Sequence, residues 1–244
     1  MNRRQALCLL PAPFLAARAG WAADSKELTE TALCEAFRLL EVASVADAIE
    51  QLYRQRAHMS HDMRPVFKTK FAGPAVTVQM KKEEHSEGSK VSQGMLDAID
   101  AAPPGSVYVM VLPDGVDVAA IGGLMATAMK VRGLAGAILD AAVRDLPQIQ
   151  RIQFPVYSRG ISPATSVNHY RFEASNVPVM CAGVRVRPND IVLADEDGVA
   201  VVPREKASEV LARAQELEDT EHKMYPFIQK YKNIRQAVDK FGRI

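Results

Sequence analysis

Apolar residues along the chain recur first at helical spacing and later in short, strand-like runs. Residues 25–40 and 42–53 carry apolar side chains every three or four positions, which predicts two helices. The polar residues 204–231 predict a long last helix that is broken near Pro226. The other predicted helices are 91–102, 119–131 and 146–152, and the predicted strands are 71–80, 106–112, 135–139, 177–180, 191–194 and 199–202.

Strands alternate with helices through most of this pattern, which is typical of an α/β fold. No internal repeat or linker-like stretch interrupts residues 24–244. We therefore predict a single α/β domain over these residues, with the long helix at its C-terminal end.

The composition is that of an ordinary globular protein. Of the 244 residues, 48% are hydrophobic, which is enough for a sizeable core. Glycine and proline, with 14 residues each, are too few for a collagen-like or low-complexity chain. The 30 basic and 29 acidic residues leave a net charge of +1. Because nucleic-acid-binding proteins normally carry a basic excess, no nucleic-acid partner is expected.

The N-terminus has the order of a secretory signal. Arg3 and Arg4 precede an apolar run over residues 6–17, and small residues lead from there to Asp24. The run is too short to span a bilayer. We therefore predict a signal peptide over residues 1–23, a periplasmic or secreted mature protein, and no membrane association after cleavage. The paired arginines favour the twin-arginine route, and Sec export is the alternative.

The three cysteines do not form the framework of a disulfide-rich protein. Cys8 lies in the predicted signal, Cys34 lies in a helical pattern, and Cys181 follows an apolar run. We interpret Cys34 and Cys181 as small core residues. An oxidising compartment would also permit a disulfide between them, which is the alternative interpretation.

Candidate chemistry is concentrated in the middle of the chain. Gly122 and Gly123 precede a helical stretch, and free N–H groups at a helix N-terminus suit a carboxylate or phosphate. A strand predicted to end near Asp140 would present Arg144 and Asp145 to the crevice where α/β folds bind ligands. The guanidinium suits an oxyanion and the carboxylate suits a hard cation. A plain tight turn and a surface ion pair are the alternative interpretations.

The stretch GGLMATAMKVRGLAGAILDAAVRD, residues 122–145, resembles the signature of the RraA-like family. Similar resemblance extends to GPAVT at 73–77, VRPND at 186–190, ADEDGV at 194–199 and VPRE at 202–205. That family contains regulators of ribonuclease activity and class II aldolases acting on 4-hydroxy-4-methyl-2-oxoglutarate. The resemblance implies a swivelling β/β/α fold, assembled as homotrimers or hexamers with sites between subunits.

The same resemblance implies a divalent metal site. Asp145 matches the aspartate with which the aldolases bind Mg²⁺ or Mn²⁺. A glutamate on a neighbouring subunit's C-terminal helix supports the metal through water. Glu221 fits the place of that glutamate, and Glu218 is its rival.

The resemblance also implies how a 2-oxo acid such as pyruvate or oxaloacetate is bound. Arg144 matches the catalytic arginine, which binds the keto oxygen and stabilises the enolate. The backbone amides of Leu124 and Met125 match those that bind the pyruvate carboxylate. The expected substrate-binding residues are Gly122, Gly123, Leu124, Met125 and Arg144.

Two positions depart from the aldolase pattern. Gly123 stands where the aldolases carry an acid that positions water for proton transfer, and Ala141 replaces a glycine. Loss of a general acid–base group typically costs about 100- to 10,000-fold in rate. Oxaloacetate decarboxylation needs no deprotonation of a hydroxyl group, so it is the simpler reaction for this site. The expected function is an exported, divalent-metal-dependent lyase acting on short 2-oxo acids.

Two alternative functions remain at this level. One is a non-catalytic RraA-like protein that binds a metabolite or another protein. The other is a lyase or hydrolase of another substrate class, with Gly123 making room for a larger ligand.

Other polar residues give weaker signals. His58, His61 and Asp62 have a spacing that suits metal binding, but such loops are mostly solvated. His169 is a candidate substrate contact. Residues 195–198, DEDG, resemble a metal loop but are better interpreted as a tight turn between two strands.

Overall fold

The computed structural model describes residues 28–243. The predicted signal peptide lies outside these residues, as do the first residues of the predicted helix at 25–40. Within the described part, no helix has both the length and the apolar character needed to cross a bilayer.

The described chain contains seven α-helices, three short 3-10 helices and eleven strands. The α-helices are α1 (Glu30–Leu39), α2 (Val42–Tyr53), α3 (Gln93–Ala101), α4 (Gly123–Val131), α5 (Leu146–Ile152), α6 (Ala207–Tyr231) and α7 (Ile234–Phe241), and the 3-10 helices are η1 (Gly88–Ser92), η2 (Gly115–Asp117) and η3 (Arg204–Lys206). The strands are β1 (Arg64–Pro65), β2 (Phe71–Lys82), β3 (Val107–Val111), β4 (Ala119–Ile121), β5 (Gly136–Val143), β6 (Val156–Ile161), β7 (Tyr170–Ser175), β8 (Val179–Cys181), β9 (Val184–Val186), β10 (Ile191–Asp195) and β11 (Gly198–Val202).

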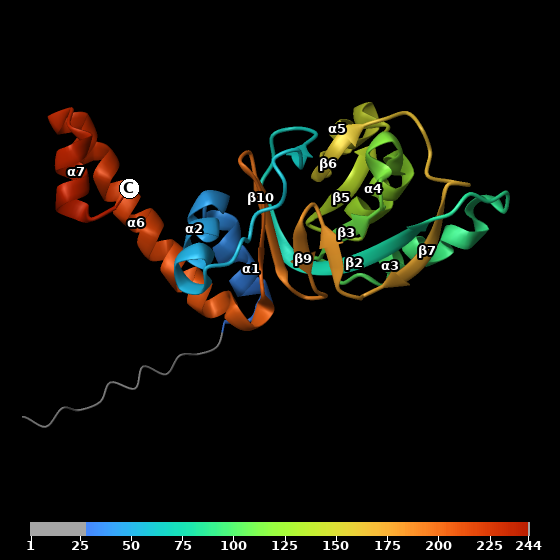
Figure 1. Cartoon of the computed structure of the whole chain (residues 1–244), viewed down its shortest axis with the longest axis horizontal. Coiled ribbons are helices and arrows are strands. Elements are labelled where there is room, and N and C mark those ends of the chain that lie inside the picture. The colour runs from blue at the N-terminus through green and yellow to red at the C-terminus, as the bar shows by residue number, and fades with distance from the viewer. Residues whose placement is uncertain (1–27, 244) are drawn as a thin grey trace, which may run out of the picture.

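Nine strands form one mixed sheet, with the order β1-β6-β5-β3-β2-β10-β11. Strand β4 pairs with β5 beside this path, β7 pairs with β2, and β8 and β9 form a separate hairpin. The long strand β2 connects the two parts of the sheet. Its first residues pair antiparallel with β10, and its later residues pair parallel with β3. Figure 1 shows α1, α2 and α6 at one end of β2 and α3, α4 and α5 toward the other.

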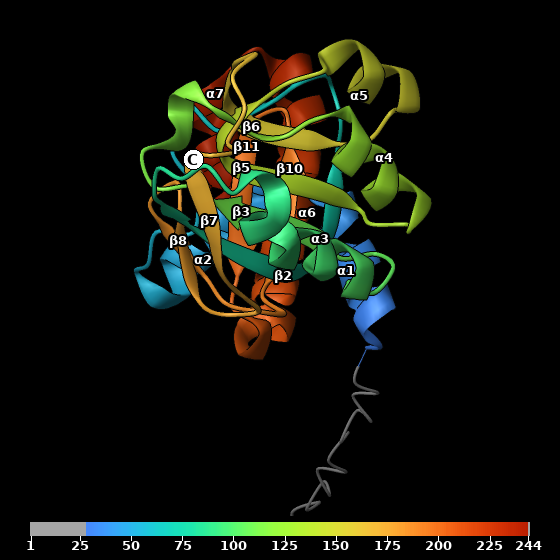
Figure 2. The same ribbon diagram turned by 90° about the vertical axis from the view of Figure 1, so that its right-hand side faces the viewer.

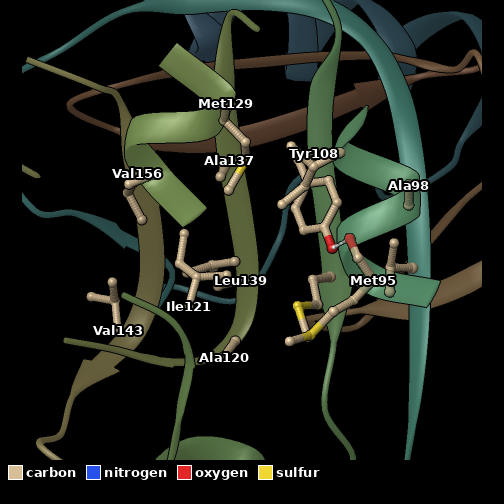
Figure 3. Close-up of a cluster of buried hydrophobic side chains, with 14 of the residues drawn as sticks. Met95, Ala98, Tyr108, Ala120, Ile121, Met129, Ala137, Leu139, Val143 and Val156 are labelled. Atoms are coloured by element: carbon tan, nitrogen blue, oxygen red, sulfur yellow. Dashed lines mark hydrogen bonds between the residues drawn. The ribbon is translucent and has the colours of Figure 1, made fainter. Parts of the chain in front are cut away.

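Three apolar cores hold this arrangement together. The first lies between the sheet and helices α3, α4 and α5, and Figure 3 shows how Tyr108 and Met95 pack within it. The hydroxyl of Tyr108 is buried there, and it donates a hydrogen bond to the carbonyl oxygen of Met95 at 3.0 Å. The second core joins α1, α2 and α6 to β10 and β11, and the third lies between the sheet and the β8–β9 hairpin.

Cys34 is buried in the second core and Cys181 in the third, and both thiols are free. The interpretation as core residues is confirmed, and the alternative of a disulfide is wrong. Burial raises the pKa of Cys34 to about 11, which keeps this thiol protonated at neutral pH.

The structure corrects several expected elements. The helix predicted over 119–131 begins only at Gly123, because residues 119–121 form the buried strand β4. A short, fully buried apolar run does not distinguish strand from helix by its pattern alone. Strand β5 continues to Val143 rather than ending near Asp140, so Ala141 is a buried strand residue and not part of a turn.

The last predicted helix is continuous through Pro226. Proline removes one backbone donor and crowds the preceding turn. Pro226 is exposed on α6, and the helix hydrogen bonds on either side of it keep the helix intact. Strands β1, β6, β7 and β9 and helix α7 were not expected.

Candidate active site

Two turns that leave neighbouring strands form the candidate site. Strand β4 pairs parallel with β5, with Ile121 opposite Val143. The amide of Arg144 donates to the carbonyl oxygen of Ile121 at 3.2 Å, which keeps the two chains together one residue further. Helices α4 and α5 start immediately after these strands and lie side by side (Figure 1, Figure 2). The pairing therefore brings the Gly122–Gly123 turn against the Arg144–Asp145 turn.

Asp145 is fixed by the N-terminus of α4. Its Oδ2 accepts a hydrogen bond from the backbone amide of Gly123 at 2.9 Å. A carboxylate in this position is stabilised by the partial positive charge of the helix end. The residue itself has φ +60°, a left-handed conformation that is uncommon for residues other than glycine. Such backbone strain is frequent at functional sites.

Arg144 and Gly122 complete the contact between the turns. The Nε of Arg144 lies 3.9 Å from Oδ2 of Asp145, and both side chains are about half exposed. A Cβ atom added at Gly122 would lie 2.5 Å from Oδ2 of Asp145 and 3.1 Å from Nε of Arg144. Glycine is therefore required at position 122 for the arginine and aspartate to take these positions.

The N-terminus of α4 also presents two unused donors. Within residues 28–243, the amides of Leu124 and Met125 have no hydrogen-bond acceptor. The Leu124 side chain is 90% exposed, whereas Met125 packs partly against the first core. Free amides at a helix N-terminus bind carboxylates and phosphates well. All five expected substrate-binding residues thus lie on these two turns.

Gln148 is a further residue of this site that was not predicted from the sequence. A Cβ atom added at Gly123 would lie 2.8 Å from Cγ of Gln148 and 3.1 Å from its Cβ. The side-chain amide of Gln148 donates to Oγ1 of Thr127 at 3.2 Å, and Thr127 donates to the carbonyl oxygen of Gly123 at 2.6 Å. An amide side chain therefore fills the space beside Gly123. The sequence feature that could have indicated Gln148 is its position in the first turn of α5, three residues after Asp145.

The donor set at Asp145 fits a magnesium-like ion rather than a metal enclosed by side chains. Within the described residues, no group of three or more histidine, cysteine, aspartate and glutamate side chains is placed to hold a metal. Mg²⁺ usually binds through one or two carboxylates and keeps several waters. The half-exposed carboxylate of Asp145, with water completing the ligand set, meets that requirement.

Glu221 and Glu218 do not join this site within one chain. Both lie on α6, which Figure 1 shows at the opposite end of the molecule from α4 and α5. Glu221 accepts a hydrogen bond from Nε of Arg243 at 2.7 Å, and Arg243 also contacts Asp47 at 3.2 Å. Burial, and to a lesser degree the nearby carboxylate of Glu41, raise the pKa of Glu218. Only a second copy of the chain could bring either glutamate to Asp145.

The weaker candidates have structural partners elsewhere. Nε of Arg159 donates to Oδ2 of Asp62 at 2.8 Å, and its Nη1 donates to Oδ1 of Asp140 at 3.0 Å. Nδ1 of His169 lies 2.7 Å from a carboxylate oxygen of Glu84. Neither set of contacts includes a residue of the two turns of the candidate site.

The DEDG stretch is the tight turn that its sequence indicates. Asp195 pairs with Gly198 at the end of the β10–β11 hairpin, which leaves Glu196 and Asp197 as the two turn residues. Gly198 has φ +147°, a conformation that favours glycine.

Comparison with known proteins gives the family of this chain. Residues 42–201 match the model of the RraA-like family, described as Aldolase/RraA. The chain belongs to the RraA-like family. Its α/β fold is therefore the swivelling β/β/α type, which confirms the expected fold class.

Individual relatives extend the match beyond the family model. A protein of Halalkalibacterium halodurans, provisionally named a 4-hydroxy-4-methyl-2-oxoglutarate aldolase, is 30% identical over 179 residues, covering 73% of this chain and 80% of that protein. The crystal structure of an uncharacterized protein from Pseudomonas syringae has a TM-score of 0.79 at 26% identity and covers 87% of this chain and 95% of its own. The crystal structure of Streptomyces coelicolor RraAS2, described as an unusual member of the RNase ES inhibitor RraA family, has a TM-score of 0.71 at 26% identity. It covers 80% of this chain and 96% of its own.

Proposed function

We propose that this RraA-like protein is a divalent-metal-dependent lyase acting on short 2-oxo acids. One observation carries the proposal: the Arg144 guanidinium, the Asp145 carboxylate and the free amides of Leu124 and Met125 converge where two neighbouring strands end. This set offers a place for a carboxylate, a donor for an adjacent oxo group and a ligand for a cation. A 2-oxo acid presents those groups next to one another.

Each protein group has a separate task in this proposal. The amides of Leu124 and Met125 bind the C1 carboxylate of the substrate, and Arg144 donates to the C2 oxo oxygen. Asp145 would hold Mg²⁺ or Mn²⁺, which when bound supplies further positive charge close to that oxygen. Negative charge grows on the C2 oxygen when the C3–C4 bond breaks, and Arg144 is already in place to stabilise that charge.

The contact between Gln148 and Gly123 favours decarboxylation of oxaloacetate over aldol cleavage. In decarboxylation, the C3–C4 bond breaks, CO₂ leaves, its electron pair forms the pyruvate enolate, and a solvent proton is added at C3. Cleavage of 4-hydroxy-4-methyl-2-oxoglutarate must also remove a proton from the C4 hydroxyl. The amide of Gln148 cannot accept that proton as a carboxylate would. We therefore propose that oxaloacetate is the better substrate and that aldol cleavage is slow.

We also propose that the functional form is a homotrimer or hexamer whose neighbouring subunit contributes Glu221, with Glu218 as the rival. Apolar side chains beside the site support this assembly, because Leu124 is 90% exposed and Ile161 is 68% exposed. Ile161 pairs with Val143, next to Arg144. A partner covering these side chains would bury apolar surface and exclude water from the site.

The same proposal includes export to the periplasm or the cell exterior. It is supported by the sequence pattern of residues 1–23. An exported protein does not meet a cytoplasmic ribonuclease, so the ribonuclease-regulating role of some family members does not suit this chain.

The proposal is tested by titrating the purified chain with Mg²⁺ and Mn²⁺ and then with oxalate, an unreactive analogue of the pyruvate enolate, in a calorimeter. Oxaloacetate decarboxylation and aldol cleavage are measured on the same samples. We expect metal-dependent oxalate binding and oxaloacetate turnover, and Arg144→Ala should weaken oxalate binding while sparing the metal. Binding without turnover of either substrate would instead support a non-catalytic metabolite-binding protein. The absence of metal-dependent oxalate binding would indicate another substrate class.

A further inference from the structure

A second concave site lies away from Arg144 and Asp145. It is a cleft of about 490 Å³ between the end of α2, strand β9 and the 3-10 helix η3. Four cationic side chains line it, together with two carboxylates and an apolar wall. We call it the basic cleft; its cations are Arg56, Arg185, Arg187 and Lys206.

Both carboxylates of the basic cleft are engaged with one of its cations. Nη2 of Arg187 lies 3.1 Å from Oδ1 of Asp190 and 2.6 Å from Oε2 of Glu205. Asp190 is buried and also accepts hydrogen bonds from the amides of Arg187 and Arg204. Its negative charge is thus satisfied inside the protein. Both acids thus make their ion pairs with Arg187.

The remaining three cations have no such partner. Within residues 28–243, no carboxylate oxygen lies within 4.0 Å of the charged nitrogens of Arg56, Arg185 or Lys206. They come from three separate parts of the chain, namely the segment after α2, strand β9 and η3, and they line one cleft. Placing three like charges around a common space raises their electrostatic energy, and an anion in the cleft would lower it.

Neutral groups hold two of these cations in place. Nε of Arg56 donates to the carbonyl oxygen of His58 at 3.0 Å, and the arginine lies over Gly183, where a Cβ would be 3.8 Å from Nη1. Nζ of Lys206 donates to Oε1 of Gln55 at 3.1 Å and lies 3.7 Å from the ring centre of Tyr53. These contacts orient the two cations without neutralising them, which lowers the ordering cost of binding an anion.

The lining defines the chemical class of the ligand. Guanidinium groups bind phosphate and carboxylate oxygens in pairs, so two arginines and a lysine suit a ligand with at least two negative charges. The apolar wall, formed by Ile49, Ala57, Val184, Val201 and Pro203, suits a carbon skeleton. The cleft volume is in the range of small-molecule sites. We propose that the basic cleft binds a multiply charged organic oxyanion, either a phosphate ester or a polycarboxylate, independently of the site at Asp145.

Calorimetry in metal-free buffer tests this proposal, with pyrophosphate and citrate as probes and acetate as the singly charged control. Metal-free conditions remove the part of anion binding at the Asp145 site that depends on a metal, and the variants below distinguish the basic cleft from the rest of that site. We expect at least one probe to bind, acetate to bind much more weakly, and added salt to weaken binding. Binding of pyrophosphate alone identifies a phosphate-bearing ligand, and binding of citrate alone identifies a polycarboxylate.

Matched variants show where the probe binds. Arg56→Gln with Arg185→Gln should lower its affinity at least about tenfold, because two charge-assisted contacts are lost. Lys206→Met, made separately, should also lower it. Lys81→Gln with Lys82→Gln removes the same charge from exposed positions on β2 and should leave binding unchanged. Failure of both probes to bind the wild-type chain would overturn the proposal. So would a folded Arg56→Gln, Arg185→Gln variant with wild-type affinity.

Discussion

The carboxylate of Asp145 accepts a hydrogen bond from the backbone amide of Gly123 at 2.9 Å, although Gly123 belongs to the preceding strand–helix unit. One side chain thus closes the first turn of α4 and keeps its other oxygen for the proposed cation. The contact joins the proposed metal ligand to the helix end whose amides are proposed to bind the substrate carboxylate. A change at Asp145 should therefore affect both stability and binding.

Two substitutions at Asp145 separate these effects. Asp145→Asn keeps an oxygen that accepts from Gly123 but removes the charge that a hard cation requires. Asp145→Ala removes both the accepting oxygen and the charge. Loss of a helix cap lowers the free energy of unfolding by about 1 kcal/mol. We expect both variants to lose Mg²⁺ or Mn²⁺ binding in calorimetry, and only the alanine variant to lose clear stability in urea unfolding. Wild-type metal binding by the asparagine variant would show that Asp145 is not the ligand.

Restoring an acid at position 123 should increase aldol cleavage. Gly123 does not have a positive φ, so the obstacle to a side chain is the contact with Gln148. We therefore expect the double variant Gly123→Asp, Gln148→Ala to be more stable than Gly123→Asp alone. Its cleavage of 4-hydroxy-4-methyl-2-oxoglutarate should rise at least about tenfold, a small part of the usual acid–base contribution.

The control is Gly123→Ala with Gln148→Ala, which adds a Cβ at position 123 without the carboxylate. Its aldolase rate should stay at the wild-type level, and oxaloacetate decarboxylation should change less in either variant. A folded, metal-binding aspartate variant without increased cleavage would favour a site built for another substrate class.

Mixing two inactive variants tests whether Glu221 acts in a neighbouring subunit. Asp145→Ala chains still carry Glu221, and Glu221→Gln chains still carry Asp145. If each site combines the two residues from different chains, random co-assembly restores about one quarter of the sites. The assay is decarboxylation after co-refolding, and Glu218→Gln mixed with Asp145→Ala tests the rival residue. No recovery with either glutamate variant would exclude a shared site of this kind.

The ion pair between Asp62 and Arg159 should contribute stability that is lost in acid. Burial disfavours the charged form of Asp62, but hydrogen bonds from Arg159 outweigh it and hold the pKa below its usual 3.8. A lowered folded-state pKa gives stability that is present above the unfolded value and lost as the pH falls through the folded value. Asp62→Asn should therefore lower the melting temperature at pH 7, and the difference should shrink below pH 3.8. A difference independent of pH would contradict this assignment.

Export predicts removal of the N-terminal segment. Cleavage at the small-residue site should give a mature chain that begins near Ala23 or Asp24. Mass spectrometry of the protein from its native host measures this directly. Replacing Arg3 and Arg4 with lysine separates the routes, because twin-arginine export should stop and Sec export should continue. An intact N-terminus in the cytoplasmic fraction would contradict the proposal.

The sequence alone was sufficient for the elements whose pattern is local. Helix α2 has the predicted bounds 42–53 and α5 the predicted bounds 146–152, because apolar spacing and flanking residues define them without help from distant contacts. The residue types of the site were also recognisable in the sequence. Paired glycines before a helix indicate an anion site, and an Arg-Asp pair after a strand indicates groups that bind an oxyanion and a cation.

Tertiary structure decided what these residues do together. Strand β4 was predicted as part of a helix, because three buried apolar residues fit the period of a helix and of a strand equally well. Its pairing with β5 makes it a strand. That pairing places Gly123 against Asp145 and Gln148 beside Gly123, contacts between separate turns that no local pattern encodes. Arg56, Arg185 and Lys206 of the basic cleft are likewise distant in sequence, and they line one cleft only because the residues after α2, strand β9 and η3 meet in the fold.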